Sequence, residues 1–170
     1  MQKMFNFIRF SHSLKNLLIF FPVIVSGNLF LLQDYSKVLI GFTIFFLLTN
    51  LCYLINDYTD RDIDKLNKLK KTKVFLDAKN LFIYLFIYLL AISLVITSFD
   101  QQENFYIYIY LLNFIFYNFY FKKKKYLDLI FLKNFYLIRV FYGCQLFDIS
   151  VSIGFIFFLF SFFLSLSIFK

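Results

Sequence analysis

The sequence predicts an all-α, polytopic transmembrane helical bundle with about six spans, and three observations support that fold class. Hydrophobic residues make up 61% of the 170 residues, and the mean hydropathy is +0.73. With only four glycines and one proline, the apolar runs are seldom interrupted. The runs are continuous, whereas the strands of a membrane barrel alternate apolar and polar residues. An open sheet is excluded because its edge would leave unsatisfied backbone groups in lipid.

Six apolar stretches have about the 17–25 residues that a spanning helix needs, or nearly so. We expect one membrane-embedded domain over residues 1–170, with spans near 16–33, 38–55, 80–99, 105–121, 126–147 and 149–169. The first follows a basic start that is typical of a signal peptide, but no small-residue cleavage site ends it, so we expect an uncleaved helix. The third stretch is uncharged from Leu81 to Phe99.

The placement of basic residues predicts the topology. Of the 18 lysines and arginines, 15 fall at the two ends of the chain, in 61–79 or in 122–125. Cytoplasmic connections carry such an excess, so we expect an integral protein of the plasma or inner membrane with both termini and segment 56–79 in the cytoplasm. The net charge of +8 then requires no nucleic-acid partner.

The segment after the second stretch contains the array Asn56, Asp57, Asp60 and Asp64. On a helix the three aspartates fall at i, i+3 and i+7, so their carboxylates point to one side. Mg²⁺ suits such a site because it takes a few carboxylates and completes its shell with water and phosphate oxygens. A solvated charged loop is the alternative. A calcium-binding EF-hand loop is rejected, because Lys65 and Lys71 stand where that loop needs glycine and glutamate.

Three ionisable residues lie inside the fifth stretch, at Asp128, Lys133 and Arg139. Such residues are costly at membrane depth, by about 2.5–3.5 kcal/mol on insertion scales, and indicate a functional or interhelical role. Asp128 and Arg139 are separated by about 16 Å along a helix and cannot pair directly. Internal pairing or snorkelling remains the alternative for these charges.

Taken together, the motifs resemble the UbiA-type intramembrane prenyltransferase superfamily, most closely its decaprenyl-phosphate phosphoribosyltransferase branch. The aspartate array is similar to the first acidic motif of the superfamily, which continues in that branch as H-P-x-K-x-x-R-P. Lys70 matches the lysine, and Lys73 replaces the arginine with its charge kept. The other similar patterns are R-P-x-x-W-x-K-N, Y-S-x-x-L-K, L-D and L-R-x-x-x-G, seen here at Arg9, Lys15, Asn16, Tyr117, Lys122, Asp128, Arg139 and Gly143.

The resemblance implies a Mg²⁺-dependent transferase. Asp57, Asp60 and Asp64 would be the metal ligands, with Asn56 beside them as a ligand or hydrogen-bonding group. The implied substrate-binding residues are Lys15, Asn16, Lys70, Lys73, Tyr117, Lys122, Asp128 and Arg139. The expected partners are the membrane, a polyprenyl phosphate or diphosphate lipid and a diphosphate-bearing small molecule. In one version phosphoribose passes from phosphoribosyl diphosphate to a polyprenyl phosphate; in the other a prenyl group passes from its diphosphate to an aromatic or other acceptor.

Two further function classes stay open. Members of the superfamily have nine transmembrane helices and a second acidic motif after the sixth, so the chain is expected to correspond to the first six, as a fragment, a truncated product or a degenerate paralogue. A truncated membrane protein or partner subunit without turnover is therefore one alternative. The other is a CDP-alcohol phosphatidyltransferase, for which Asp60 and Asp64 have the final spacing but the residues before them do not fit.

Overall fold

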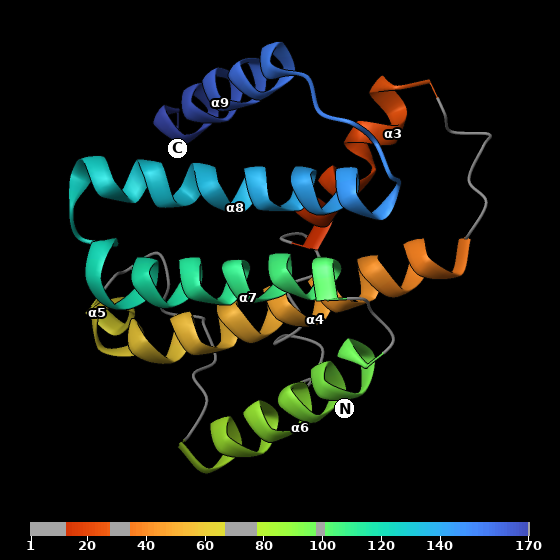
Figure 1. Cartoon of the computed structure of the whole chain (residues 1–170). Helices are drawn as coiled ribbons and strands as arrows, with labels where there is room; N and C mark the ends of the chain where they lie inside the picture. Colours follow the sequence, from red (N-terminus) through yellow and green to blue (C-terminus); the bar gives the residue numbers. More distant parts are fainter. Residues whose placement is uncertain (1–12, 28–34, 67–77, 98–100, 170) are drawn as a thin grey trace. The chain divides into compact units, whose positions relative to one another are not determined.

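The computed structural model describes residues 13–27, 35–66, 78–97 and 101–169, and these residues are almost entirely helical (Figure 1). Within those ranges there are seven α-helices, two short helices of other types and no strand, which confirms the predicted all-α class. In chain order the elements are η1 (Leu14–Phe20), α3 (Phe21–Val25), α4 (Tyr35–Thr59), α5 (Arg61–Leu66), α6 (Ala78–Ile96), α7 (Gln101–Phe116), η4 (Tyr117–Phe121), α8 (Lys125–Leu146) and α9 (Ile153–Ile168).

Each predicted apolar stretch contains a helix, and the first differs most from expectation. It starts as the 3-10 helix η1, continues as α3 and turns at Ser26 and Gly27. Pro22 lies in the first turn of α3. Proline is tolerated there because its missing N–H would have no helical partner. Residues 28–34 of this stretch lie outside the described residues.

Two helices are long and apolar enough to cross a membrane, at Leu39–Thr59 within α4 and Lys79–Ile96 within α6. The apolar helical segments Leu14–Val25 and Ile153–Ile168 are shorter. A 16-residue helix such as α9 is about 24 Å long, less than the ~30 Å thickness of a hydrocarbon core. Two candidate spans are thus present among the described residues, and the bundle of six stays a prediction.

The chain divides into two compact units, Met1–Leu14 with Ile44–Ser98, and Lys15–Thr43 with Phe99–Lys170. We call them the aspartate unit and the arginine unit. The single domain expected over 1–170 stays a prediction. In the aspartate unit the side chains of Ile44, Phe45 and Leu48 are fully buried along α4. Two residues after Leu48, Asn50 donates to the Phe46 carbonyl at 2.8 Å and to the Ser13 hydroxyl at 3.4 Å.

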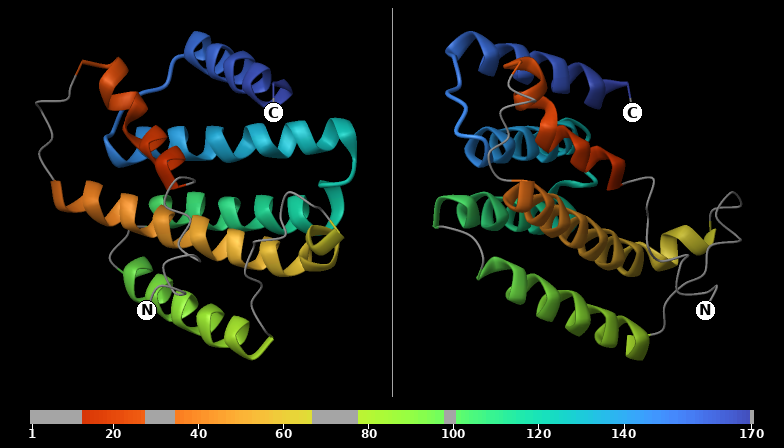
Figure 2. Two further views of the ribbon diagram at one scale, coloured as in Figure 1. Left: turned by 180° about the vertical axis from the view of Figure 1, so that it is seen from behind. Right: turned by 90° about the vertical axis from the view of Figure 1, so that its right-hand side faces the viewer.

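In the arginine unit, α8 lies between α7 and α9, and α7 and α8 run antiparallel (Figures 1 and 2). Val140 and Cys144 of α8 form a buried core with Leu159 and Phe163 of α9. The helix α3 also packs against α8. The central position of α8 explains why it carries the buried charges of this unit, since polar groups in helical bundles face the interior.

The end of α8 is closed by a Schellman motif. Asp148 adopts a left-handed conformation with φ 51°, the N–H of Ile149 donates to the Cys144 carbonyl at 2.9 Å, and the N–H of Asp148 donates to the Gln145 carbonyl at 3.3 Å. Four residues later the Ser152 hydroxyl accepts from the N–H of Phe155 at 3.2 Å and caps α9. These caps fix the connection between α8 and α9.

Candidate functional site

The aspartate array spans the junction of α4 and α5, and the helical register continues through it. Asp60 lies in the turn after Thr59, yet its N–H donates to the Asn56 carbonyl at 3.0 Å, and the N–H of Asp64 donates to the Asp60 carbonyl at 2.8 Å. Both bonds join residues four apart, as in an α-helix. Asn56, Asp60 and Asp64 therefore share one helical face, and Asp57 lies three residues before Asp60 on the adjoining part of that face.

Burial distinguishes these carboxylates from their neighbour Asp62. The side chain of Asp62 is 93% exposed and forms an ion pair with Lys65 at 3.6 Å. Asp64 is buried, while Asp57 and Asp60 are half-buried. The helical face that carries Asp57, Asp60 and Asp64 is therefore less exposed than the position of Asp62. The choice between a metal site and a solvated charged segment stays open.

The donor chemistry of the array fits Mg²⁺, because Asn56, Asp57 and Asp60 all supply oxygen. Among the described residues, no group of three His, Cys, Asp or Glu side chains is arranged so that it could hold a metal ion. Mg²⁺ does not require such a cage, since it is usually bound through one or two carboxylates together with waters and substrate phosphates. The assignment of Asp57, Asp60 and Asp64 as metal ligands stays a prediction. Lys70 and Lys73, the expected diphosphate-binding lysines, lie outside the described residues.

The arginine unit contains a buried polar cluster centred on Arg139, which is 3% exposed. Its guanidinium donates through Nε to Asn16 Oδ1 at 2.8 Å, through Nη2 to the Tyr110 hydroxyl at 2.7 Å and through Nη1 to the Phe135 carbonyl at 2.6 Å. The guanidinium carbon also lies 4.9 Å from the centre of the Tyr110 ring. Arg139 thus joins η1, α7 and α8, and the interhelical role expected for it is confirmed.

Aromatic rings surround this cluster on the α7 side. Phe135 packs edge-on against Tyr110 at 5.1 Å and against Tyr117 at 5.7 Å between ring centres. Tyr117 opens the π-helix η4, in which its carbonyl accepts from the N–H of Lys122 at 2.9 Å. The wide turn thus begins and is closed at the two residues that match the Y-S-x-x-L-K pattern, and their substrate-binding roles stay predictions. π-Helical turns are rare and are frequent at functional sites.

The L-R-x-x-x-G pattern places a second contact one turn beyond Arg139. A Cβ at Gly143 would overlap the carbonyl oxygen of Ile19, so only glycine allows this close approach of α8 to η1. On the same side, the Lys15 ammonium lies 5.6 Å from the centre of the Tyr136 ring. The segments around residues 15–16 and 139–143, which carry two of the patterns described in the sequence analysis, therefore pack on each other.

The other two charges of α8 behave differently from Arg139. Lys133 is 2% exposed, and its ammonium lies 3.2 Å from the centre of the Phe160 ring on α9. Asp128 is half-buried in the first turn of α8, where the helix dipole favours a negative charge. Lys133 is buried and makes a cation–π contact with Phe160 of α9.

Sequence reasoning missed Tyr110. The tyrosines at 106, 108 and 110 alternate as in a strand, and this spacing alone does not single out one of them as part of a site. A helical reading would have singled out Tyr110, because Asn113 and Tyr117 follow it at i+3 and i+7 on the same face. Asn113 is also buried, accepts from Asn134 at 3.5 Å and donates to the Phe131 carbonyl at 3.2 Å.

Comparison with known proteins adds no family assignment. No protein-family model matches the sequence, and no characterised protein or solved structure is significantly similar to it.

Proposed function

We propose that this chain is a membrane-embedded, Mg²⁺-dependent transferase that binds a diphosphate-bearing donor at the aspartate array, as in the UbiA-type superfamily that its motifs resemble. One observation carries the proposal: the helical register continues through the junction of α4 and α5, so that Asn56, Asp60 and Asp64 share a face. The half-burial of Asp57 and Asp60 beside the fully solvated Asp62 supports the same site.

The array would bind and orient the donor. Asn56, Asp57, Asp60 and Asp64 supply oxygen atoms, and Mg²⁺, when bound there, would neutralise charge on the diphosphate as it leaves. Because carboxylates alone would repel a diphosphate, donor binding at the array is expected to depend on the cation. The lysines that follow α5 in the sequence would contribute further positive charge.

The favoured reaction is transfer of phosphoribose from phosphoribosyl diphosphate to a polyprenyl phosphate. A phosphate oxygen of the lipid forms a bond to ribose C1 while the bond from C1 to the diphosphate oxygen breaks, and the electron pair leaves with the diphosphate. The substrate-binding roles expected for Lys15, Asn16 and Arg139 stay predictions; within the arginine unit, Arg139 holds Asn16 through a 2.8 Å hydrogen bond.

The test is a titration of the purified protein in detergent with phosphoribosyl diphosphate and, separately, with a polyprenyl diphosphate, each with and without Mg²⁺. We expect Mg²⁺-dependent binding of phosphoribosyl diphosphate that the double substitution Asp57→Ala with Asp60→Ala abolishes. Binding of the polyprenyl donor alone would replace this reaction by prenyl transfer. Failure of both donors to bind would overturn the proposal in favour of a protein without turnover.

A further inference from the structure

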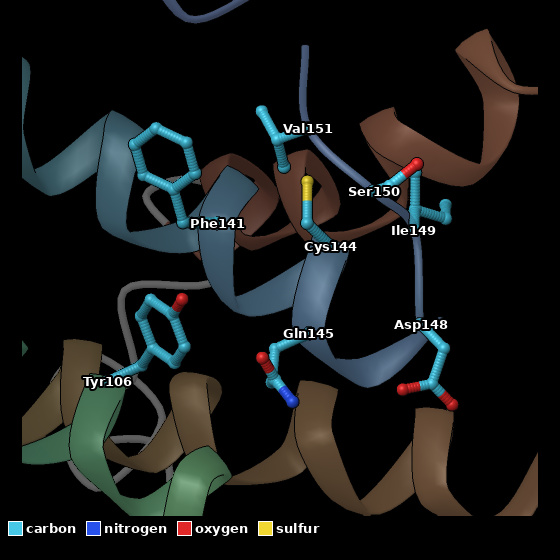
Figure 3. A pocket seen from close by; sticks show the side chains of 8 residues that line it. All are labelled: Tyr106, Phe141, Cys144, Gln145, Asp148, Ile149, Ser150 and Val151. Carbon is cyan, nitrogen blue, oxygen red and sulfur yellow. The ribbon is translucent and has the colours of Figure 1, made fainter. Parts of the chain in front are cut away.

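Two adjoining cavities lie in the arginine unit, and neither is lined by Arg139 or by its partners Asn16, Tyr110 and Phe135. A cavity of about 300 Å³, here the end pocket, is found where α8 ends, and its partly polar lining includes Gln145, Asp148 and Ser150 (Figure 3). A groove of about 470 Å³, here the side groove, runs between α7 and α8. Tyr106 and Phe141 line both cavities. Together they form a site with one polar and one apolar end.

The end pocket is suited to a positively charged group. Of the described residues that line the two cavities, Asp148 is the one charged side chain. The Schellman motif holds it at the last turn of α8, and Figure 3 shows its carboxylate on the same side of that turn as the Gln145 amide. The Tyr106 ring on the opposite wall offers an aromatic face, which attracts cations.

The side groove is suited to a hydrocarbon chain. Its walls include Ile109, Leu112, Phe116, Phe131 and Leu137. Its two asparagines, Asn113 and Asn134, are hydrogen-bonded to each other. The lining extends from Tyr106 to Phe116 on α7 and from Phe131 to Phe141 on α8, or about 15 Å along each helix. Mostly apolar walls with a few polar groups are typical of ligand sites.

We propose that these cavities bind a single-chain amphiphile with an ammonium head group. The head lies in the end pocket beside Asp148, and the chain lies along the side groove. A sulfate or phosphate head without a cationic group would meet the Asp148 carboxylate, and no basic side chain is found among the described residues of the lining to compensate it. The inference does not depend on the diphosphate chemistry proposed above, because none of the residues that line the two cavities belongs to the proposed donor site.

The sequence contains no tryptophan, so a single introduced one is a specific reporter. The Phe116→Trp variant places it in the side groove, and the Phe157→Trp variant places it on α9 at a position that is 69% exposed and outside both cavities. The probes are two spin-labelled dodecyl amphiphiles, one with a trimethylammonium head and one with a sulfate head, added to the full chain in uncharged maltoside micelles. Quenching of the tryptophan fluorescence is measured against probe concentration.

At the Phe116→Trp reporter, the ammonium probe should reach half-quenching at a concentration about two- to fivefold lower than the sulfate probe. This ratio corresponds to the free energy that a partly exposed ion pair contributes. The protein carries a net charge of +8, so unspecific binding favours the sulfate probe, and the Phe157→Trp reporter should show that opposite order. Adding Asp148→Asn to Phe116→Trp should remove the ammonium preference; asparagine also accepts the left-handed conformation, so the fold is retained.

A second variant tests the chain separately from the head. Leu137→Phe narrows the side groove without changing Asp148. It should therefore raise the half-quenching concentration of each probe at the Phe116→Trp reporter. The head-group assignment would be overturned if the ratio of half-quenching concentrations for the two probes were the same at both reporters. It would also be overturned if the ammonium probe were still preferred after Asp148→Asn. Unchanged quenching by both probes in Leu137→Phe would overturn the placement of the chain.

Discussion

The aspartate array and the Arg139 cluster are both polar regions in an apolar chain, but they are built in opposite ways. The array is local: its backbone hydrogen bonds join residues four apart, and two of its carboxylates stay half-exposed. The cluster joins Arg139 to Asn16, 123 residues away, and is buried. A side chain that binds a ligand has to stay accessible from outside the protein. A buried charged side chain instead needs hydrogen-bond partners supplied by the protein itself. The array is thus suited to binding and the cluster to holding helices together.

The largest effect on stability is expected from Arg139→Met, which breaks the cluster. Methionine fills similar space but removes three charge-assisted hydrogen bonds and leaves Asn16 and Tyr110 without that partner. We expect the free energy of unfolding to fall by about 3 kcal/mol, measured by denaturant titration in detergent with circular dichroism. Arg139→Lys keeps the positive charge but lacks the planar guanidinium group. Its free energy of unfolding should therefore lie between those of the wild type and Arg139→Met. Wild-type stability of Arg139→Met would contradict the structural role.

The next effect concerns the close packing of α8 on η1. Gly143→Ala forces a Cβ against the Ile19 carbonyl and should destabilise the protein by about 1–3 kcal/mol. The matched control is Gly154→Ala, since a Cβ there meets nothing within 4 Å. The same denaturant titration separates them. An equal free energy of unfolding for the two alanine variants would contradict the close contact between Gly143 and the Ile19 carbonyl.

A smaller effect is expected between α8 and α9, where Lys133 lies over the Phe160 ring. A double-mutant cycle with Lys133→Met and Phe160→Leu should give a coupling free energy of about 1–2 kcal/mol, as for a desolvated cation–π contact. Additive effects of the two substitutions would show that the ammonium and the ring do not interact.

The smallest effect belongs to the solvated side of the aspartate segment. Lys65→Ala removes the ion pair with Asp62, whose side chain is 93% exposed. Exposed pairs contribute about 0–1 kcal/mol, so the free energy of unfolding should change by less than about 0.5 kcal/mol. A loss above about 1 kcal/mol would mean that Lys65 contributes to the fold through contacts other than this pair.

What could be predicted from the sequence follows the same division. Apolar runs located the helices, because length and hydropathy are local properties, and the spacing of Asp57, Asp60 and Asp64 predicted a shared face that the backbone bonds of Asp60 and Asp64 support. Tyr110, the π-turn at Tyr117 and the glycine contact at Gly143 needed the packed structure. They depend on which distant segments meet, and residue spacing does not carry that information. The burial difference between Asp62 and Asp64 also comes from packing, since both are aspartates of α5.

The most direct test of the central claim compares two carboxylates of one segment in a single calorimetric titration. Asp60→Asn and Asp62→Asn each remove one charge within three residues of sequence, and each is titrated with phosphoribosyl diphosphate in the presence of Mg²⁺. The account predicts that Asp60→Asn weakens Mg²⁺-dependent binding at least about tenfold, or 1.4 kcal/mol, while Asp62→Asn binds as the wild type does. Equal binding by both variants would contradict it, because the aspartate array would then have no part in holding the donor.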